Sequence, residues 1–287
     1  MNGGTEGARP LRAGGQALAD GVLMRTERAW AIARIDGTVE TGELPGNRLA
    51  AVPVLRVLGG LGGALKLGIV KGMLRKGGGS DARVRGSRRA NRKFLFALVA
   101  AEAVVAALGF WLGRFDLPQW GTALMTLLPW MAVLGVLRLA TAPSLWRFHG
   151  AEHKAVAAHE QSIDLSDTGA VLACPRVHNR CGTNLVFLLA LLSLAMVAVP
   201  AVLQVPMFLV ALALTVELMS LAARWPRFLA SRVLLSGGRM LQRVVTTAEP
   251  TPAEQAVACR SLAAALETHA RLEAADAAAD ERVPVAA

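Results

Sequence analysis

The chain has 287 residues, of which 54% are hydrophobic and only 18% are charged, and its mean hydropathy is +0.43. Because charged residues make up about a quarter of an ordinary soluble domain, this composition argues against a disordered chain and against a simple soluble enzyme. The 31 Lys and Arg against 21 Asp and Glu give a net charge of +10, which favours an anionic partner, either nucleic acid or a membrane surface.

The part of the chain ahead of its first long apolar run divides by composition into four regions. These are a disordered tail, a cytoplasmic segment, an interfacial or re-entrant helix and a basic linker, at residues 1–13, 14–47, 48–76 and 77–93. Residues 1–20 lack the apolar core of a signal peptide. In the second region, side-chain character alternates from Ala29 to Glu43 around Asp36-Gly37, a dipeptide suited to a tight turn, which predicts a small β-hairpin.

Four apolar runs have about the twenty residues that an α-helix needs to cross a bilayer. They are residues 94–113 and 121–140, within a segment at 94–141, and residues 184–203 and 206–222, within a segment at 184–222. Clusters of Arg and Lys precede the first run and follow the fourth, and the positive-inside rule places such clusters in the cytoplasm. The basic excess thus indicates membrane topology rather than nucleic-acid binding. It predicts a multi-pass protein of a bacterial-type inner membrane with both termini cytoplasmic.

Between the second and third runs, residues 142–183 form a polar cytoplasmic segment with the residue types of a metal site. On a helix, its polar residues His149, Glu152, His153 and Glu160 share one face. Two imidazoles one turn apart can bind one ion, and a carboxylate beside them can ligate it, orient an imidazole or act as the catalytic base. The pattern His-x-x-Glu-His is the inverted form of a zinc-peptidase motif. The alternative is a polar helix face whose histidines only form hydrogen bonds.

A second set of metal-ligand types follows about twenty residues later. The chain's three cysteines, Cys174, Cys181 and Cys259, are too few for a disulfide framework and indicate reduced thiols. Two of them flank His178 in a loop-like stretch just before the third run. Thiolate, imidazole and carboxylate together favour Zn²⁺ over Mg²⁺ or Ca²⁺. A closed site of two His and two Cys would be structural, whereas an open position would make it catalytic. The sequence leaves both readings open.

The sequence resembles the YqhQ-like family of membrane proteins, a domain-of-unknown-function family described as predicted metal-dependent enzymes. Four blocks carry the resemblance, Gly14–Arg25, Phe148–Glu160, His178–Leu185 and Gln242–Pro250. It implies a multi-span membrane protein with metal residues at His149, Glu152, His153, Glu160, His178 and Cys181. Asp20 stands where family members typically have Glu, and Cys174 has no place in the shared pattern.

The remaining predictions concern the C-terminal region and residues expected to surround the metal ligands without binding the ion, which we call the outer groups. Asp20, Thr246 and Thr247 are candidate groups around the metal residues on the strength of the resemblance, and Glu217 is one because an ionisable residue inside a membrane span is a functional candidate. Residues 223–271 are predicted to be cytoplasmic, with a soluble helix over residues 252–271, and residues 272–287 a disordered tail.

The sequence therefore predicts a mainly α, polytopic membrane protein with about four transmembrane helices, a small N-terminal β-hairpin region and cytoplasmic helices. The leading functional hypothesis is a Zn²⁺-dependent hydrolase on the cytoplasmic face, in which His149, His153 and one of Cys181, His178 or Glu160 bind the metal and Glu152 is the base. One alternative is a non-catalytic scaffold stabilised by the metal, and a weaker one is a transporter. The predicted partners are the lipid bilayer, a divalent metal and an unknown substrate, with no nucleic acid.

Overall fold

A computed structural model of the protein describes residues 10–44 and 96–280, apart from residues 98, 109, 113, 116 and 196–198. The predicted interfacial helix at 48–76 and the basic linker at 77–93 lie outside the described residues. The chain forms two compact units. The first, which we call the sheet unit, is assembled from residues 1–46, 144–176 and 248–287, and the second, the helical unit, from residues 47–143 and 177–247.

The sheet unit is built on a four-stranded antiparallel sheet in the order β1-β2-β3-β4. The strands are β1 (Gly14–Ala17), β2 (Gly21–Arg25), β3 (Ala29–Arg34) and β4 (Val39–Glu43). Gly37 has φ +90° and its N–H donates to the Arg34 carbonyl at 3.1 Å, so the turn after Asp36 uses the positive φ that glycine adopts readily. The predicted hairpin is confirmed as β3 and β4. It is half of a larger sheet, because the chain before it adds two more strands.

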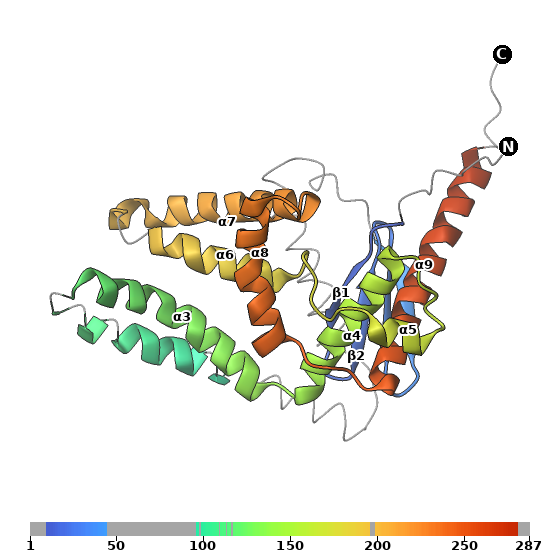
Figure 1. Ribbon diagram of the computed structural model, residues 1–287, viewed down its shortest axis with the longest axis horizontal. Coiled ribbons are helices and arrows are strands. Elements are labelled where there is room, and N and C mark those ends of the chain that lie inside the picture. The colour runs from blue at the N-terminus through green and yellow to red at the C-terminus, as the bar shows by residue number, and fades with distance from the viewer. Residues whose placement is uncertain are drawn as a thin grey trace, which may run out of the picture. The chain divides into compact units, whose positions relative to one another are not determined.

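Helices α4 (Pro143–Glu160), α5 (Thr168–Ala173) and α9 (Pro252–Asp280) complete the sheet unit (Figure 1). Val22 and Met24 of β2, with their partners Ala33 and Ala31 of β3, join side chains of all three helices in one hydrophobic core. The small side chains of β3 allow a close approach of α9, whose Ser261 Oγ donates to the carbonyls of Val22 and Ala31 at 3.0 Å each.

Helix α9 is longer than the sequence predicts. It continues through residues 272–280, which composition assigned to a disordered tail. The described part of that tail is therefore helical, and the prediction of disorder is wrong there. An ion pair of 2.6 Å between Arg28 and Asp276 joins this stretch to the residues before β3.

Helix α4 is in close backbone contact with the segment that precedes α9. The Ala248 N–H donates to the Trp146 carbonyl at 2.8 Å, and a Cβ added to Gly150 would lie 2.1 Å from the Ala248 oxygen. Nearby, Arg147 Nε donates to a Glu254 carboxylate oxygen at 2.8 Å. Burial opposes ionisation of Glu254, but hydrogen bonds from Thr251 and Arg147 outweigh it and lower the pKa of this carboxyl below its usual value.

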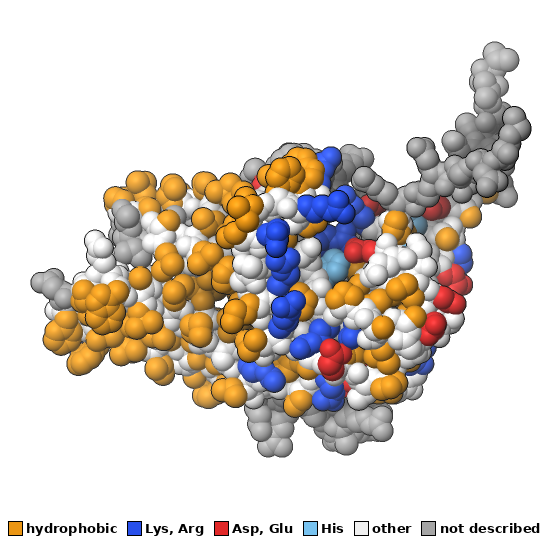
Figure 2. Space-filling view, viewed as in Figure 1, with side chains coloured by type: hydrophobic (Ala, Val, Ile, Leu, Met, Phe, Trp, Pro, Cys, Tyr) orange, Lys and Arg blue, Asp and Glu red, His pale blue; other side chains and the backbone are white. Residues whose placement is uncertain are grey.

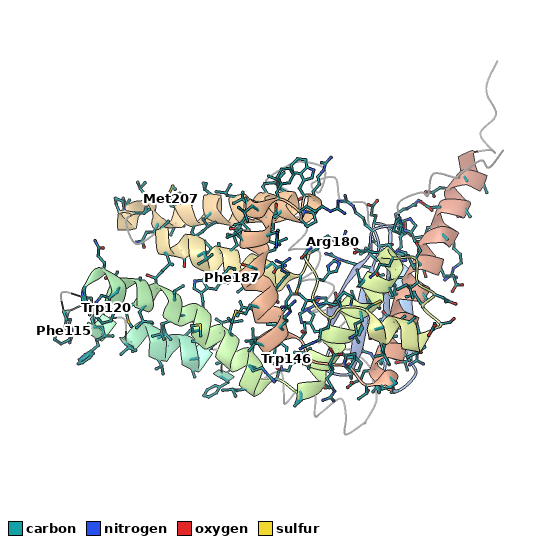
Figure 3. The ribbon with its side chains drawn as sticks, viewed as in Figure 1. Phe115, Trp120, Trp146, Arg180, Phe187 and Met207 are labelled. Atoms are coloured by element: carbon teal, nitrogen blue, oxygen red, sulfur yellow. The ribbon has the colours of Figure 1, made fainter. Side chains whose placement is uncertain are left out.

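The helical unit contains α3 (Gln119–Ala140), α6 (Gly182–Ala195), α7 (Ala201–Arg224), α8 (Leu229–Leu241) and a π-helical turn, η4 (Gln242–Thr246). Helix α6 contacts α3, α7 and α8. Close packing of α6 and α8 depends on two glycines, because a Cβ on Gly238 would lie 2.7 Å from the Asn184 Cα and one on Gly237 would meet the Phe187 ring (Figure 3).

Among the described residues, two helices are long and apolar enough to cross a membrane, Gln119–Ala140 and Val202–Arg224. In the most apolar 18-residue stretch of the first helix no residue is buried, and in that of the second helix 22% of the residues are buried. Neither therefore resembles the core helix of a soluble protein. Residues 99–112 and α6 are apolar but shorter. Two of the four predicted spans therefore have the required length and composition, and the other two stay predictions.

Candidate metal-binding residues

The two histidines of the inverted motif lie one turn apart on α4. Pro143 occupies the first position of this helix, where its missing N–H costs no hydrogen bond. The rings of His149 and His153 have centroids 4.5 Å apart. The His153 side chain is 4% exposed, which is the environment of a positioned group rather than of a solvated one. The predicted pairing of the imidazoles on one helix face is thus present within the sheet unit.

A hydrogen bond orients the His153 ring. Its Nδ1 lies 2.7 Å from the carbonyl oxygen of Arg176. A carbonyl can only accept, so Nδ1 carries a proton, and in the neutral imidazole Nε2 is then the nitrogen with the lone pair. This is the arrangement found around metal-ligating histidines, where a carbonyl or carboxylate fixes the tautomer and the ring direction.

Glu152 lies on the same helix, 7% exposed, against the first strand. A Cβ added to Gly15 of β1 would come within 3.1 Å of the Glu152 Cγ. The glycine therefore leaves room for the Glu152 side chain, as it does for the Leu23 carbonyl and the Met24 sulfur of β2, which would lie closer still. Gly15 belongs to one of the blocks that carry the family resemblance, where the sequence analysis assigned it no role.

Lys154 was not predicted, and it organises the chain segment that leads to Arg176. Its side chain is 6% exposed, and Nζ donates to the carbonyls of Leu172 and Cys174 at 2.7 and 2.9 Å. Nζ also lies 3.1 Å from a carboxylate oxygen of Glu249. Two neighbouring side chains of α4 therefore hold the same segment. Lys154 binds the carbonyls of residues 172 and 174, and His153 binds the carbonyl of residue 176. The only sign of this role in the sequence is a lysine that stands next to a run of small and apolar residues in the predicted helix.

We expect Lys154→Met to lower the free energy of unfolding by about 3 kcal/mol, since two buried carbonyls lose their donor. Thermal unfolding of the purified protein measures this. Glu249→Gln is the matched control, because the Glu249 side chain is 65% exposed and an exposed ion pair contributes at most about 1 kcal/mol. Equal losses in the two variants would contradict a structural role of Lys154.

The second set of predicted ligands lies in the helical unit, in the loop before α6. The Cys181 sulfur accepts the N–H of Thr183 at 3.4 Å at the start of that helix. The His178 N–H donates to Gln242 Oε1 at 2.8 Å, and Gln242 Nε2 donates to the His178 carbonyl at 3.1 Å. Gln242 is fully buried and is the first residue of the π-helical turn, an element that is rare and frequent at functional sites. It therefore fixes the loop that carries His178 and Cys181.

The predicted outer groups have partners of their own. Asp20 accepts a 2.8 Å hydrogen bond from the buried Arg34. In the helical unit, the hydroxyls of Thr246 and Thr183 are 3.0 Å apart, and the Thr247 hydroxyl donates to the Gln242 carbonyl at 2.7 Å. These contacts give the residues structural roles. Their predicted roles around a metal, and that of Glu217 in α7, stay predictions.

Glu160 and Cys174 lack the surroundings of metal ligands, for different reasons. Glu160 is exposed at the last position of α4, seven residues and thus about 10 Å along the helix axis from His153. Cys174 lies in the hydrophobic core, and its Sγ donates to the Ala170 carbonyl at 3.6 Å. Burial raises the pKa of the Cys174 thiol, against the effect of the Lys154 charge. Such a thiol is structural rather than reactive.

The predicted ligands thus form two groups, one on α4 of the sheet unit and one before α6 of the helical unit, joined through the peptide bond between Arg176 and Val177. Fold and residues together define a mainly helical protein with an antiparallel sheet unit and two apolar helices of membrane-spanning length. The chain belongs to the DUF1385 family, described as proteins of unknown function, whose profile matches residues 121–268, just over half of its length. The comparisons with curated proteins and with solved structures found no match.

Proposed function

We propose that the protein is a membrane-anchored metalloprotein in which His149, His153 and Cys181 bind one Zn²⁺ ion. The observation that carries the proposal is the hydrogen bond from His153 Nδ1 to the Arg176 carbonyl, which directs Nε2 of a buried imidazole toward a ligand role. Two imidazoles and a thiolate are the donor set of the borderline-soft metals, among which Zn²⁺ is the common one without redox chemistry.

The covalent chain supports the inclusion of Cys181. Arg176, whose carbonyl contacts His153, precedes Cys181 by five residues, and five extended residues span at most about 18 Å. The connecting loop is therefore long enough for Cys181 to reach the imidazole pair. Glu160, by contrast, is held about 10 Å along the helix axis from His153 by α4 itself, and for this reason the proposed set omits it.

Three protein ligands leave one position of a tetrahedral site open, which is the arrangement of catalytic zinc. A Zn²⁺ ion bound there would supply Lewis-acid chemistry, by polarising a carbonyl or phosphoryl oxygen and by lowering the pKa of water. Glu152, adjacent to His153 in sequence and almost fully buried, would take the proton from the attacking water. We therefore propose a hydrolase.

We also propose that the protein crosses the inner membrane several times, with the metal residues on the cytoplasmic side. Arg138 lies in the last turn of α3 and Arg224 in the last turn of α7. Basic residues at span ends favour the cytoplasmic face. A metal site on the cytoplasmic face of the membrane would act on substrates at the lipid–water boundary.

The metal content of the purified full-length protein tests the proposal. We expect one zinc per chain by elemental analysis, and almost none in the double variant His149→Ala, His153→Ala. His159→Ala is the matched control, because His159 lies on the same helix but its Nε2 contacts the Leu11 carbonyl at 2.8 Å. Unchanged metal content in the double variant, with the circular dichroism spectrum also unchanged, would overturn the proposal.

A further inference from the structure

Contacts within the helical unit cover one side of helix α8. Its buried positions are Ser231, Leu235 and Gly238, continued by Gln242 in the next turn. Their spacing of three and four residues places them on one side of the helix. At Gly238 this side is in close contact with α6.

The opposite side of α8 carries a stripe of apolar side chains exposed to solvent. Leu229, Val233, Met240 and Val244 are 74, 62, 67 and 67% exposed. Their separations of four, seven and four residues align them along the helix and the turn that follows it. Without a partner this stripe leaves four large apolar side chains in water, so it indicates an interaction surface.

A row of arginines borders the apolar stripe. Arg232, Arg239 and Arg243 are separated by seven and four residues and thus share a third side of the helix. Figure 2 shows basic side chains in a row over α8, beside the apolar surface of the neighbouring helices. No Asp or Glu occurs between Glu217 and Glu249, so this part of the chain is uniformly basic.

The direction of α8 distinguishes it from the apolar helices of the same unit. In Figure 1, α3, α6 and α7 run side by side, whereas α8 runs across them. It begins five residues after the end of α7 at Arg224. A helix that runs across two helices of a membrane-spanning bundle lies roughly parallel to the membrane plane, and α8 would do so if α3 and α7 span the membrane.

We propose that α8 is an interfacial helix that binds the anionic lipids of one leaflet, with the apolar stripe in the acyl boundary and the arginines on the lipid phosphates. An apolar face bordered by basic residues is the signature of such helices. A second copy of the chain fits less well, because an antiparallel two-fold contact through this stripe would bring two rows of arginines together. The inference rests on the membrane placement of α3 and α7 and not on the metal.

Lipid binding by the full-length protein in detergent tests the charge component. Native mass spectrometry with added phosphatidylglycerol or phosphatidylcholine compares wild type with Arg232→Gln, Arg243→Gln. We expect wild type to prefer phosphatidylglycerol over phosphatidylcholine. Each substituted arginine should lower this preference about fivefold. Arg260→Gln, Arg271→Gln on α9 removes the same charge and should change nothing. An equal loss in both double variants, or none in either, would overturn the proposal.

The depth of the stripe in the bilayer tests the apolar component. Nitroxide labels at Val233→Cys and Met240→Cys, in protein reconstituted with both lipids, should be more accessible to oxygen than to a water-soluble nickel chelate. A label at Glu267→Cys, exposed on α9, should show the reverse, and labelled parent protein gives the background from the native cysteines. Nickel access to residues 233 and 240 would refute the insertion of α8. Shielding from both reagents would also refute it, because it indicates a protein contact. Retention of the protein in membranes after carbonate extraction separates failure of this proposal from failure of the proposed membrane topology.

Discussion

Glu152→Gln is expected to leave the bound zinc and the fold intact while lowering hydrolytic activity by about 10²- to 10⁴-fold, the contribution of a positioned general base. The amide keeps the shape of the side chain and its place against Gly15, but it cannot accept a proton. Chromogenic ester and phosphodiester probes, assayed with the zinc-loaded protein in lipid, provide the measurement.

Glu160→Gln is the matched control for this change. It alters the same residue type on the same helix, at an exposed position outside the proposed site, and should retain full activity. If Glu152→Gln matched wild type with its zinc retained, the catalytic role would fail and the metal would have a structural role. That outcome would favour the alternative of a metal-stabilised scaffold.

Local signals in the sequence predict those parts of the fold that depend on local chemistry. The turn at Asp36-Gly37 is fixed by two residues, and α4 follows from Pro143 and the helix-forming residues after Gly150. The pairing of His149 with His153 needs only the helix period. For these elements the sequence analysis and the structure agree.

The remainder of the sheet unit depends on contacts between distant parts of the chain. Strand β2 is buried at four consecutive positions, so it lacks the alternation that marks a strand with one solvent-exposed face. Its burial comes from a core that combines residues 22–33 with residues 148–174 and 257–265. Composition divided these stretches among three separate regions, and no local pattern predicts that they fold together.

The candidate site shows the same division. The ligand residue types and their spacing follow from the sequence, but the groups that hold them do not. Gln242 contacts His178 across 64 positions of the chain, and Lys154 contacts Cys174 across 20. Both are buried polar residues. Their hydrogen-bond partners lie far away in the chain, so the sequence alone does not indicate them.

Gly150→Ala should destabilise the protein by about 3 kcal/mol or more, and it should also disturb the metal residues. The new Cβ would lie 2.1 Å from the Ala248 oxygen and 3.2 Å from its carbonyl carbon. Backbone atoms cannot turn away as a side chain does, so α4 must separate from the segment before α9. Overpacking of this kind typically costs 1–3 kcal/mol, and more where the backbone must move.

Thermal unfolding and zinc content, measured on the same preparation, check this prediction. We expect the midpoint of unfolding to fall by roughly 10 °C, with partial loss of zinc because His149 is the adjacent residue. Gly14→Ala is the matched control in the same unit, since a Cβ there would meet nothing within 4 Å. A midpoint for Gly150→Ala equal to that of Gly14→Ala would mean that α4 and the residue 248 segment are not in close contact.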